Sequence, residues 1–358
     1  MKIVVSAGGT GGHIYPALAI IDKFREKEKN LEVIYIGTHN RMEKDVVPKR
    51  NIRYEELEIY GFSKKDIKRD FKNIFLIRKA YKKCLKLMEE FKPDIVLGIG
   101  GYVTYPVIKA AHKLGIKVFI HEQNSIPGKT NKALAKYATL IGVSFPDTNN
   151  VFPKSKTFLS GNPVATNAVV AKKYDKTILG FHENKKLVVL VAGSLGSSTI
   201  NNKLISMIKE MKHKDYELLY ITGKDLYDKF TKNLEIPSNV KVVPYIDNLS
   251  SLLKSTDLVV TRAGAGIMSE IAALKLPAIF IPSPYVANNH QYYNALELKK
   301  KNCCELIEEK NLTADLLLKT IDDLLNNEEK LKTFKSNLNV VGITDSSERI
   351  YKKIKEVL

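Results

Sequence analysis

Three glycine-rich loops each follow a short apolar run of the chain. They are GGTGG (8–12), GSLG (193–196) and AGAG (263–266). A glycine turn after a strand lets the backbone approach an anion, and the N-terminus of the following helix favours negative charge. Three such loops in one chain therefore predict an anionic ligand such as a nucleotide. The alternative for any single loop is close packing of a helix on a strand.

Polar side chains with useful chemistry accompany these loops. His13 directly follows the first loop, where a helix should begin, so we expect its imidazole to face a binding cleft. The cluster HEQN (121–124) ends another apolar run, at the edge of an open sheet where ligands bind. Arg262, Ser269 and Glu270 flank the third loop, and NNHQ (288–291) follows a proline-rich turn. The alternatives are a structural histidine and ordinary helix or loop capping.

Two common nucleotide-binding classes do not fit this sequence. A dinucleotide-dependent dehydrogenase has an acidic residue at the end of its second strand, but this run ends YIGTH (35–39). The first loop is also GGTGG instead of G-x-G-x-x-G. A P-loop needs the full pattern G-x-x-x-x-G-K followed by Ser or Thr; Gly128-Lys129-Thr130 supplies its end, but Gln123 stands where the first glycine should be. The ligand is therefore expected to be a different kind of nucleotide.

Short runs rich in Val and Ile alternate with helical stretches, which is typical of parallel α/β sheets buried on both faces. The predicted strands are 3–7, 32–37, 94–100, 117–122, 187–193, 217–223, 241–246, 257–262 and 278–282. Because each half opens with a strand, a glycine loop and a helix, we predict two doubly wound Rossmann-like domains. Their predicted ranges are 1–162 and 163–340. Residues 341–358 are predicted to end in a helix that packs back on the first domain, with Asp345 and Glu348 as a capping box.

Composition bounds the class of protein. The chain has 358 residues and a net charge of +18, which suggests an anionic partner or simply a lysine-rich surface. Cys84, Cys303 and Cys304 are expected to be ordinary thiols and no metal site is expected. The sequence contains no signal peptide and no apolar run of about 18 residues, so we expect no membrane span. A nucleic-acid-binding protein is an alternative, but no known basic motif supports it.

The motifs taken together resemble those of the MurG family, the N-acetylglucosaminyltransferases of peptidoglycan synthesis. The resemblance covers nearly the whole chain in order, through GGTGGHIYPALAI (8–20), GTHNRMEKDVVP (37–48), PDIVLGIGGYVTYP (93–106), HEQNSIPGKTNKALAKYA (121–138), SGNPV (160–164), AGSLGS (192–197), RAGAGIMSEIAALKLPAIFIP (262–282) and NNHQYYNA (288–295). It implies a GT-B fold, with two Rossmann-like domains facing a central cleft. It also implies transfer of GlcNAc from UDP-GlcNAc to the C4 hydroxyl of MurNAc in undecaprenyl-linked lipid I, with inversion, to give lipid II.

The resemblance assigns donor contacts to specific positions. The predicted contacts are Thr10, Gly11 and Gly12 near the diphosphate and sugar, Asn124 on the sugar, Ser194 on the diphosphate, Ile246 on the uracil, Ala265, Gly266, Ile267, Met268, Ser269 and Glu270 along the nucleotide, and Gln291 on the GlcNAc hydroxyls. Glu270 is expected to bind the ribose hydroxyls. The chain departs from some family members at Ala165, where they have Arg, and at His290, where they have Gln.

Inversion implies a single displacement in which a base removes the acceptor proton. His13 is the first candidate for this base because an unperturbed imidazole has a pKa of about 6.5, and Glu122 is the second. The sequence contains no D-x-D triad, so no metal ion and no obligatory cofactor are expected. Another UDP-sugar enzyme of the same fold, such as a glycolipid synthase or a UDP-GlcNAc 2-epimerase, remains the alternative.

The segment 64–83 predicts a peripheral contact with a membrane. It carries a local net charge of +7, and Ile67, Phe71, Ile74, Phe75 and Tyr81 recur at helical spacing. A basic helix with an apolar face is typical of a segment that lies in a lipid interface; the alternative is a core helix with a solvated lysine face. Expected partners are the donor, lipid I, anionic lipids of the inner membrane and other cell-wall enzymes, with the chain on the cytoplasmic face of the cell membrane.

Overall fold

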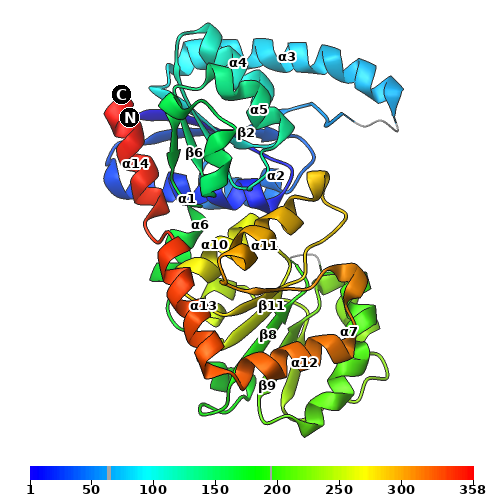
Figure 1. The fold of residues 1–358 in the computed structure, drawn as a ribbon. Coiled ribbons are helices and arrows are strands. Elements are labelled where there is room, and N and C mark those ends of the chain that lie inside the picture. The colour runs from blue at the N-terminus through cyan, green and yellow to red at the C-terminus, as the bar shows by residue number, and fades with distance from the viewer. Residues whose placement is uncertain (63–65, 194–195) are drawn as a thin grey trace. The chain divides into compact units, whose positions relative to one another are not determined.

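The computed structural model describes residues 1–62, 66–193 and 196–358. The chain divides into two compact units (Figure 1). Unit 1 comprises Met1–Thr166 together with Asp345–Leu358, and unit 2 comprises Asn167–Thr344. The boundaries predicted at residues 162 and 340 lie a few positions before the observed ones. Helix α6 (Val164–Val170) spans the junction.

Unit 1 is built on a seven-stranded sheet in which every pair of neighbouring strands is parallel. Its strands are β1 (Lys2–Ala7), β2 (Glu32–Thr38), β3 (Arg53–Leu57), β4 (Ile95–Gly100), β5 (Lys117–Glu122), β6 (Leu140–Val143) and β7 (Thr157–Leu159). Its helices are α1 (Gly11–Lys27), α2 (Glu43–Val46), α3 (Ile67–Phe91), α4 (Thr104–Lys113), α5 (Lys129–Leu134) and α14 (Ser346–Val357). The spatial order is β3-β2-β1-β4-β5-β6-β7.

Unit 2 repeats this plan with a six-stranded parallel sheet in the order β10-β9-β8-β11-β12-β13. Its strands are β8 (Leu187–Val191), β9 (Glu217–Ile221), β10 (Val240–Val243), β11 (Leu258–Thr261), β12 (Ala278–Phe280) and β13 (Glu305–Leu306). Its helices are α7 (Ser198–Glu210), α8 (Tyr227–Thr231), α9 (Leu249–Leu253), α10 (Ala265–Ala273), α11 (His290–Lys300), α12 (Ala314–Leu325) and α13 (Glu328–Val341).

The strand order explains where ligands should bind in each unit. In both sheets the order reverses beside the first strand, between β1 and β4 and between β8 and β11. Open α/β sheets bind ligands outside the carboxyl ends of their strands at such a reversal. The three glycine loops follow β1, β8 and β11, so each lies at one of these two points. The prediction of two Rossmann-like, doubly wound domains is confirmed.

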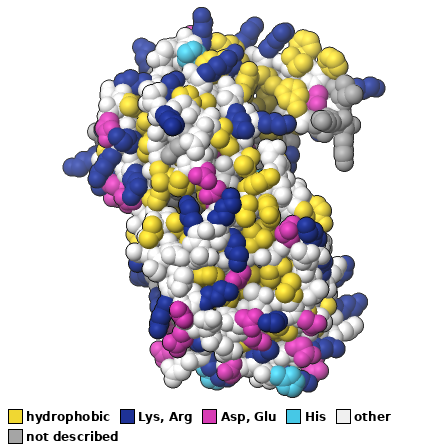
Figure 2. All heavy atoms as spheres, viewed as in Figure 1, with side chains coloured by type: hydrophobic (Ala, Val, Ile, Leu, Met, Phe, Trp, Pro, Cys, Tyr) yellow, Lys and Arg dark blue, Asp and Glu magenta, His cyan; other side chains and the backbone are white. Residues whose placement is uncertain are grey.

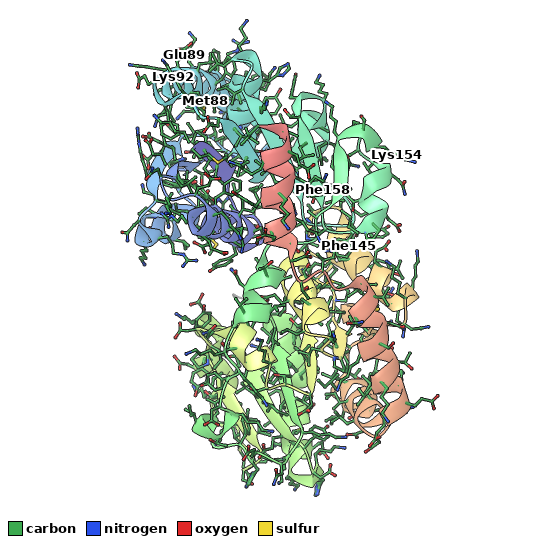
Figure 3. The ribbon with its side chains drawn as sticks, turned by 90° about the vertical axis from the view of Figure 1, so that its left-hand side faces the viewer. Met88, Glu89, Lys92, Phe145, Lys154 and Phe158 are labelled. Atoms are coloured by element: carbon green, nitrogen blue, oxygen red, sulfur yellow. The ribbon has the colours of Figure 1, made fainter. Side chains whose placement is uncertain are left out.

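Helix α14 completes the core of unit 1. Ile350 and Ile354 are fully buried in the cluster that contains β1 and α1, and Phe158 belongs to the same cluster beside the helix (Figure 3). The Tyr351 hydroxyl donates to Glu28 Oε1 over 2.8 Å. The predicted capping box at its start is wrong, because the Asp345 side chain makes no capping bond and instead accepts from Arg349 Nε at 2.7 Å.

Asp66 is the N-cap of helix α3, and its Oδ1 accepts from the Arg69 backbone N–H at 3.0 Å. One side of the helix packs on the sheet through buried Leu76, Ala80, Cys84 and Met88, and Figure 3 labels Met88 in its last turn. Tyr81 was predicted to share an exposed apolar face with Phe71 and Phe75. It is instead half-buried against this core. Lys64, Lys65 and the Ile67 side chain lie outside what the structure describes.

Candidate functional site

The first glycine loop presents an open helix N-terminus. Thr10 is the N-cap of α1 in an extended conformation, with φ −145°, and its side chain makes no capping bond. The first N–H groups of a helix have no partner within it and carry positive partial charge. Thr10 and Gly12 are exposed, and Gly11 adds no side chain beyond the backbone. The loop is therefore suited to bind a negatively charged group through its backbone.

The Glu43 carboxylate fixes the position of this loop by hydrogen bonds, a role that was not predicted from the sequence. Its buried carboxylate accepts from Gly9 N at 3.2 Å through Oε2, and from Thr38 N at 3.1 Å and Thr38 Oγ1 at 2.6 Å through Oε1. A Cβ on Gly8 would lie 2.5 Å from Glu43 Oε1. Glycine is therefore required at position 8, because a side chain there would clash with the Glu43 carboxylate. One feature of the sequence could have indicated this role: Glu43 is an acidic residue five positions after the end of β2, within the GTHNRMEKDVVP motif.

His13 lies in the first turn of α1, half-buried beside the end of β4. Its Nδ1 is 3.1 Å from Gln123 Oε1. Gly100 has φ +123°, and a Cβ there would lie 2.6 Å from His13 Nδ1. The absence of a side chain at this glycine thus makes room for the imidazole. The structure brings together the GGTGGH, GIGGY and HEQN motifs around this ring.

Glu122, the second candidate for the catalytic base, ends β5 and lies within a set of hydrogen bonds. The carboxylate is buried, and its two oxygens accept from Asn124 N at 3.0 Å, Gly128 N at 3.0 Å and Asn131 Nδ2 at 2.9 Å. Asn124 Nδ2 adds a longer bond of 3.3 Å. These bonds tie the segment 124–131 to Glu122. Its choice as the second candidate for the catalytic base stays a prediction.

The same bonds position Asn124, the predicted sugar contact in unit 1. Both its backbone and side-chain nitrogens donate to Glu122 Oε1, and its carbonyl accepts from Thr148 Oγ1 at 3.2 Å. Asn124 follows the carboxyl end of β5 and is half-buried. Its predicted contact with the donor sugar stays a prediction.

In unit 2 the second glycine loop leads into α7. Ser194 lies outside the described residues. Gly193 and Gly196 have φ +108° and +76°, a region that favours glycine. Ser197 caps α7 by accepting from Ile200 N at 3.3 Å, and its hydroxyl also accepts from Arg262 Nη2 at 2.8 Å. The buried Arg262 forms an ion pair of 2.5 Å with Glu309. The guanidinium therefore connects the third glycine loop with the start of α7 and with the turn that follows β13.

The third glycine loop opens α10 with Gly264 as N-cap, and no side chain caps it. The N–H groups of Ala265, Gly266 and Ile267 are thus the orphan donors of this helix. Ser269 Oγ donates to the Ala265 carbonyl at 2.8 Å. The Met268 side chain is 1% exposed, so it points into the core and only its backbone can meet a ligand.

Glu270 is the most perturbed carboxylate of this region. Ser250 Oγ donates to its Oε1 at 2.8 Å. Burial raises the pKa of Glu270 to about 7, although the Ser250 hydrogen bond acts in the opposite direction. Perturbed carboxyl groups next to an anion-binding helix terminus are candidates for function. This supports the choice of Glu270 as a ligand contact.

The remaining predicted donor residues lie on separate elements of unit 2. Gln291, in the first turn of α11, accepts from Ser283 N at 2.9 Å through Oε1, which fixes its amide beside the proline-rich turn. Ile246 follows β10 and is half-buried against the core. A cavity of about 270 Å³ next to this turn is lined by residues such as Tyr285, Tyr292 and Lys203, and by none of the predicted donor contacts.

Two further searches concern metal ions and membrane spans. Within residues 1–62, 66–193 and 196–358, no group of three His, Cys, Asp or Glu side chains is arranged to hold a metal ion. No helix in the same ranges combines the length and apolar character needed to cross a bilayer. Cys84, Cys303 and Cys304 are buried free thiols.

The fold of both units and their loop-to-helix anion sites define a nucleotide-sugar enzyme of the GT-B class. The profile described as the glycosyltransferase family 28 N-terminal domain matches residues 3–143, and that of the C-terminal domain matches residues 187–350. The chain belongs to glycosyltransferase family 28. It is 42% identical, over 100% of its length and 99% of the relative's, to the UDP-N-acetylglucosamine–N-acetylmuramyl-(pentapeptide) pyrophosphoryl-undecaprenol N-acetylglucosamine transferase of Halalkalibacterium halodurans.

Solved structures agree with this membership. The crystal structure of Acinetobacter baumannii MurG matches with a TM-score of 0.80 and 27% identity, covering 99% of each chain. A putative UDP-N-acetylglucosamine 2-epimerase from Listeria monocytogenes matches with a TM-score of 0.73 and 16% identity, covering 99% of this chain and 95% of that one. At such low identity the second likeness shows the fold alone.

Proposed function

We propose that this enzyme transfers GlcNAc from UDP-GlcNAc to the C4 hydroxyl of MurNAc in lipid I, with inversion, and so makes lipid II for peptidoglycan synthesis. The observation that carries the proposal is the full-length identity of 42% with the H. halodurans relative, whose name states this donor and acceptor. The C4 position and the inversion follow from the resemblance to the family.

The proposed chemistry is a single displacement. His13 Nε2 takes the proton of the acceptor hydroxyl, the oxygen forms a bond to C1 of GlcNAc, and the C1–O bond to UDP breaks with its electron pair on UDP. Negative charge therefore grows on the diphosphate. In unit 2 the uncapped N-terminus of α10 is the feature that supports its stabilisation without a metal ion.

A transfer assay tests the proposal directly. With UDP-GlcNAc labelled in the sugar and a short-chain lipid I analogue, we expect a labelled β-linked disaccharide lipid, in EDTA as well as without it. The same analogue lacking the C4 hydroxyl serves as the matched control and should accept nothing. Conversion of UDP-GlcNAc to its 2-epimer in the absence of an acceptor would instead identify the alternative epimerase.

We further propose that α3 holds the enzyme on the anionic face of the membrane. Phe62, Phe71, Ile74 and Phe75 are exposed, and Phe71 and Phe75 expose 66% and 68% of their surface. Figure 2 shows hydrophobic side chains gathered over the first half of α3, with Lys and Arg side chains around them. Large apolar groups exposed together mark an interaction surface, and the basic rim favours anionic lipids over a protein core.

Vesicle co-sedimentation checks this surface. The change Phe71→Ser/Phe75→Ser/Lys68→Glu/Lys72→Glu is expected to weaken binding to anionic vesicles at least about tenfold, because each basic residue contributes about 1 kcal/mol and the aromatic groups no longer insert. Salt should weaken the wild type in the same direction. A matched control in unit 2, Ile178→Ser/Val340→Ser/Lys319→Glu/Lys332→Glu, alters equally exposed residues. Equal loss in both variants would show that α3 is not the membrane-binding surface.

A further inference from the structure

A continuous set of hydrogen bonds links His13 to the interior of unit 1 through Gln123. The Gln123 side chain is 1% exposed and contacts three partners. Its Oε1 faces His13 Nδ1 at 3.1 Å, and its Nε2 faces the Ile99 carbonyl at 2.7 Å and His121 Nδ1 at 3.0 Å. His121 is fully buried, and its Nε2 lies 2.9 Å from the Gly161 carbonyl.

Two backbone carbonyls determine the direction of every bond in this set, because a carbonyl oxygen can only accept. The atom that faces the Ile99 carbonyl must be the amide nitrogen of Gln123, since an oxygen there would be repelled. At the other end, His121 must carry a proton on Nε2 to donate to the Gly161 carbonyl. Neutral His121 then has a lone pair on Nδ1, which accepts from the same Gln123 nitrogen.

His121 remains neutral under ordinary conditions, so this pattern persists. Burial lowers the pKa of His121 to about 4, and the hydrogen bond to the Gly161 carbonyl does not offset it. With both protons of the Gln123 amide directed at Ile99 and His121, only its oxygen remains for His13. That oxygen accepts, so the His13 nitrogen opposite it must donate.

We propose that Gln123 is a positioning residue that holds neutral His13 in the tautomer with its proton on Nδ1, which makes Nε2 the basic nitrogen. An isolated histidine side chain prefers the opposite tautomer, with the proton on Nε2. In that tautomer Nε2 has no lone pair with which to accept the proton of the acceptor hydroxyl. The nitrogen that carries the proton is set by the bond made at the other nitrogen. This inference rests on the proposed function only where it makes Nε2 the catalytic base.

The tautomer can be measured without any activity. In a chain labelled with ¹⁵N in the rings of its seven histidines, the His13 signals are assigned by their loss in His13→Gln. At about pH 8, where an ordinary imidazole is neutral, we expect the wild type to show a protonated Nδ1 and an unprotonated Nε2. The reverse pattern in the wild type would overturn the inference, whatever the variants do.

Variants then connect the tautomer to turnover. Gln123→Met keeps the length of the side chain but removes its hydrogen bonds, and we expect a shift of His13 towards the Nε2–H tautomer with a fall in kcat of about 10- to 1000-fold. The KM and Kd for UDP-GlcNAc should change little, whereas the melting temperature should fall, because the buried Ile99 carbonyl and His121 Nδ1 lose their donor. Gln123→Glu retains an acceptor for Nδ1–H but places its second oxygen opposite the Ile99 carbonyl, so we expect it to recover only part of kcat and also to lower the melting temperature. A fall in donor affinity or stability without a change of tautomer would assign Gln123 a purely structural role.

The two proposals fail in different ways. If the wild type has the expected tautomer but His13→Ala retains full turnover, the positioning stands and the base is another residue. If no transferase activity is found, the ring signals still decide the inference about Gln123.

Discussion

Replacing His13 by alanine is expected to lower kcat for GlcNAc transfer by about 10²–10⁴-fold, the usual contribution of a positioned general base. The Kd of UDP-GlcNAc should change little, because the first loop of unit 1 binds through its backbone. Initial rates at saturating donor and acceptor, together with calorimetric titration of the donor, separate these two quantities.

Glu122→Gln is the comparison for that experiment. Its carboxylate accepts from two backbone N–H groups and two asparagine amides, and an amide at this position would point an N–H group at one of those donors. We expect a lower melting temperature, since each buried donor left unpaired costs about 1–3 kcal/mol. The fall in kcat should be smaller than for His13→Ala. If the order is reversed and stability is unchanged, the proton acceptor is Glu122.

Glu270→Ala is expected to raise the Kd of UDP-GlcNAc by about 10- to 150-fold. The loss corresponds to about 1.5–3 kcal/mol for charge-assisted hydrogen bonds to the ribose hydroxyls. The variant should fold normally, because removing the side chain also removes the cost of burying a carboxylate. Ser250→Ala provides a milder control, since it takes away only the hydroxyl that donates to Glu270. An unchanged donor Kd in Glu270→Ala would remove this residue from the site.

The raised pKa of Glu270 adds a dependence on pH with a definite sign. Hydrogen bonds from the ribose favour the carboxylate, so the affinity for UDP-GlcNAc should rise as pH increases through about 7 and level off above it. The slope cannot exceed about tenfold per pH unit for one group. UDP-GlcNAc is the suitable probe because its diphosphate stays fully ionised over this range. Glu270→Gln should abolish the dependence; if it persists in that variant, another group titrates.

The sequence predicts most of the strands that are buried on both faces and misses most of the edge strands. All nine predicted apolar runs form strands, but β3, β6, β7 and β13 were not predicted. Three of these are edge strands, and β3 reads RYEEL, with a polar pattern that a solvated edge permits. Strand β6 is central but only four residues long. Edge position accounts for three of the missed strands and shortness for the fourth.

Site residues were predictable from the sequence only where they belong to a contiguous motif. Motifs that are contiguous in the chain, such as GGTGGH and HEQN, could be placed on strand ends and helix starts from their sequence. The roles of Glu43 and Gln123 could not, because each depends on backbone groups brought from distant strands. The bonds around Glu122 were missed for the same reason: the N–H of Gly128 that donates to it comes from a later turn of the chain.

Helix α14 also has a consequence for biosynthesis. Most of unit 1 is synthesised before unit 2, yet Ile350 and Ile354, which follow unit 2 in the chain, fill part of its core beside Phe24. Domains usually fold in the order in which they are synthesised. Here unit 2, made from a continuous segment, can fold while the nascent chain still lacks the helix that completes unit 1. Until α14 is synthesised, unit 1 therefore exposes an apolar surface to which a chaperone can bind.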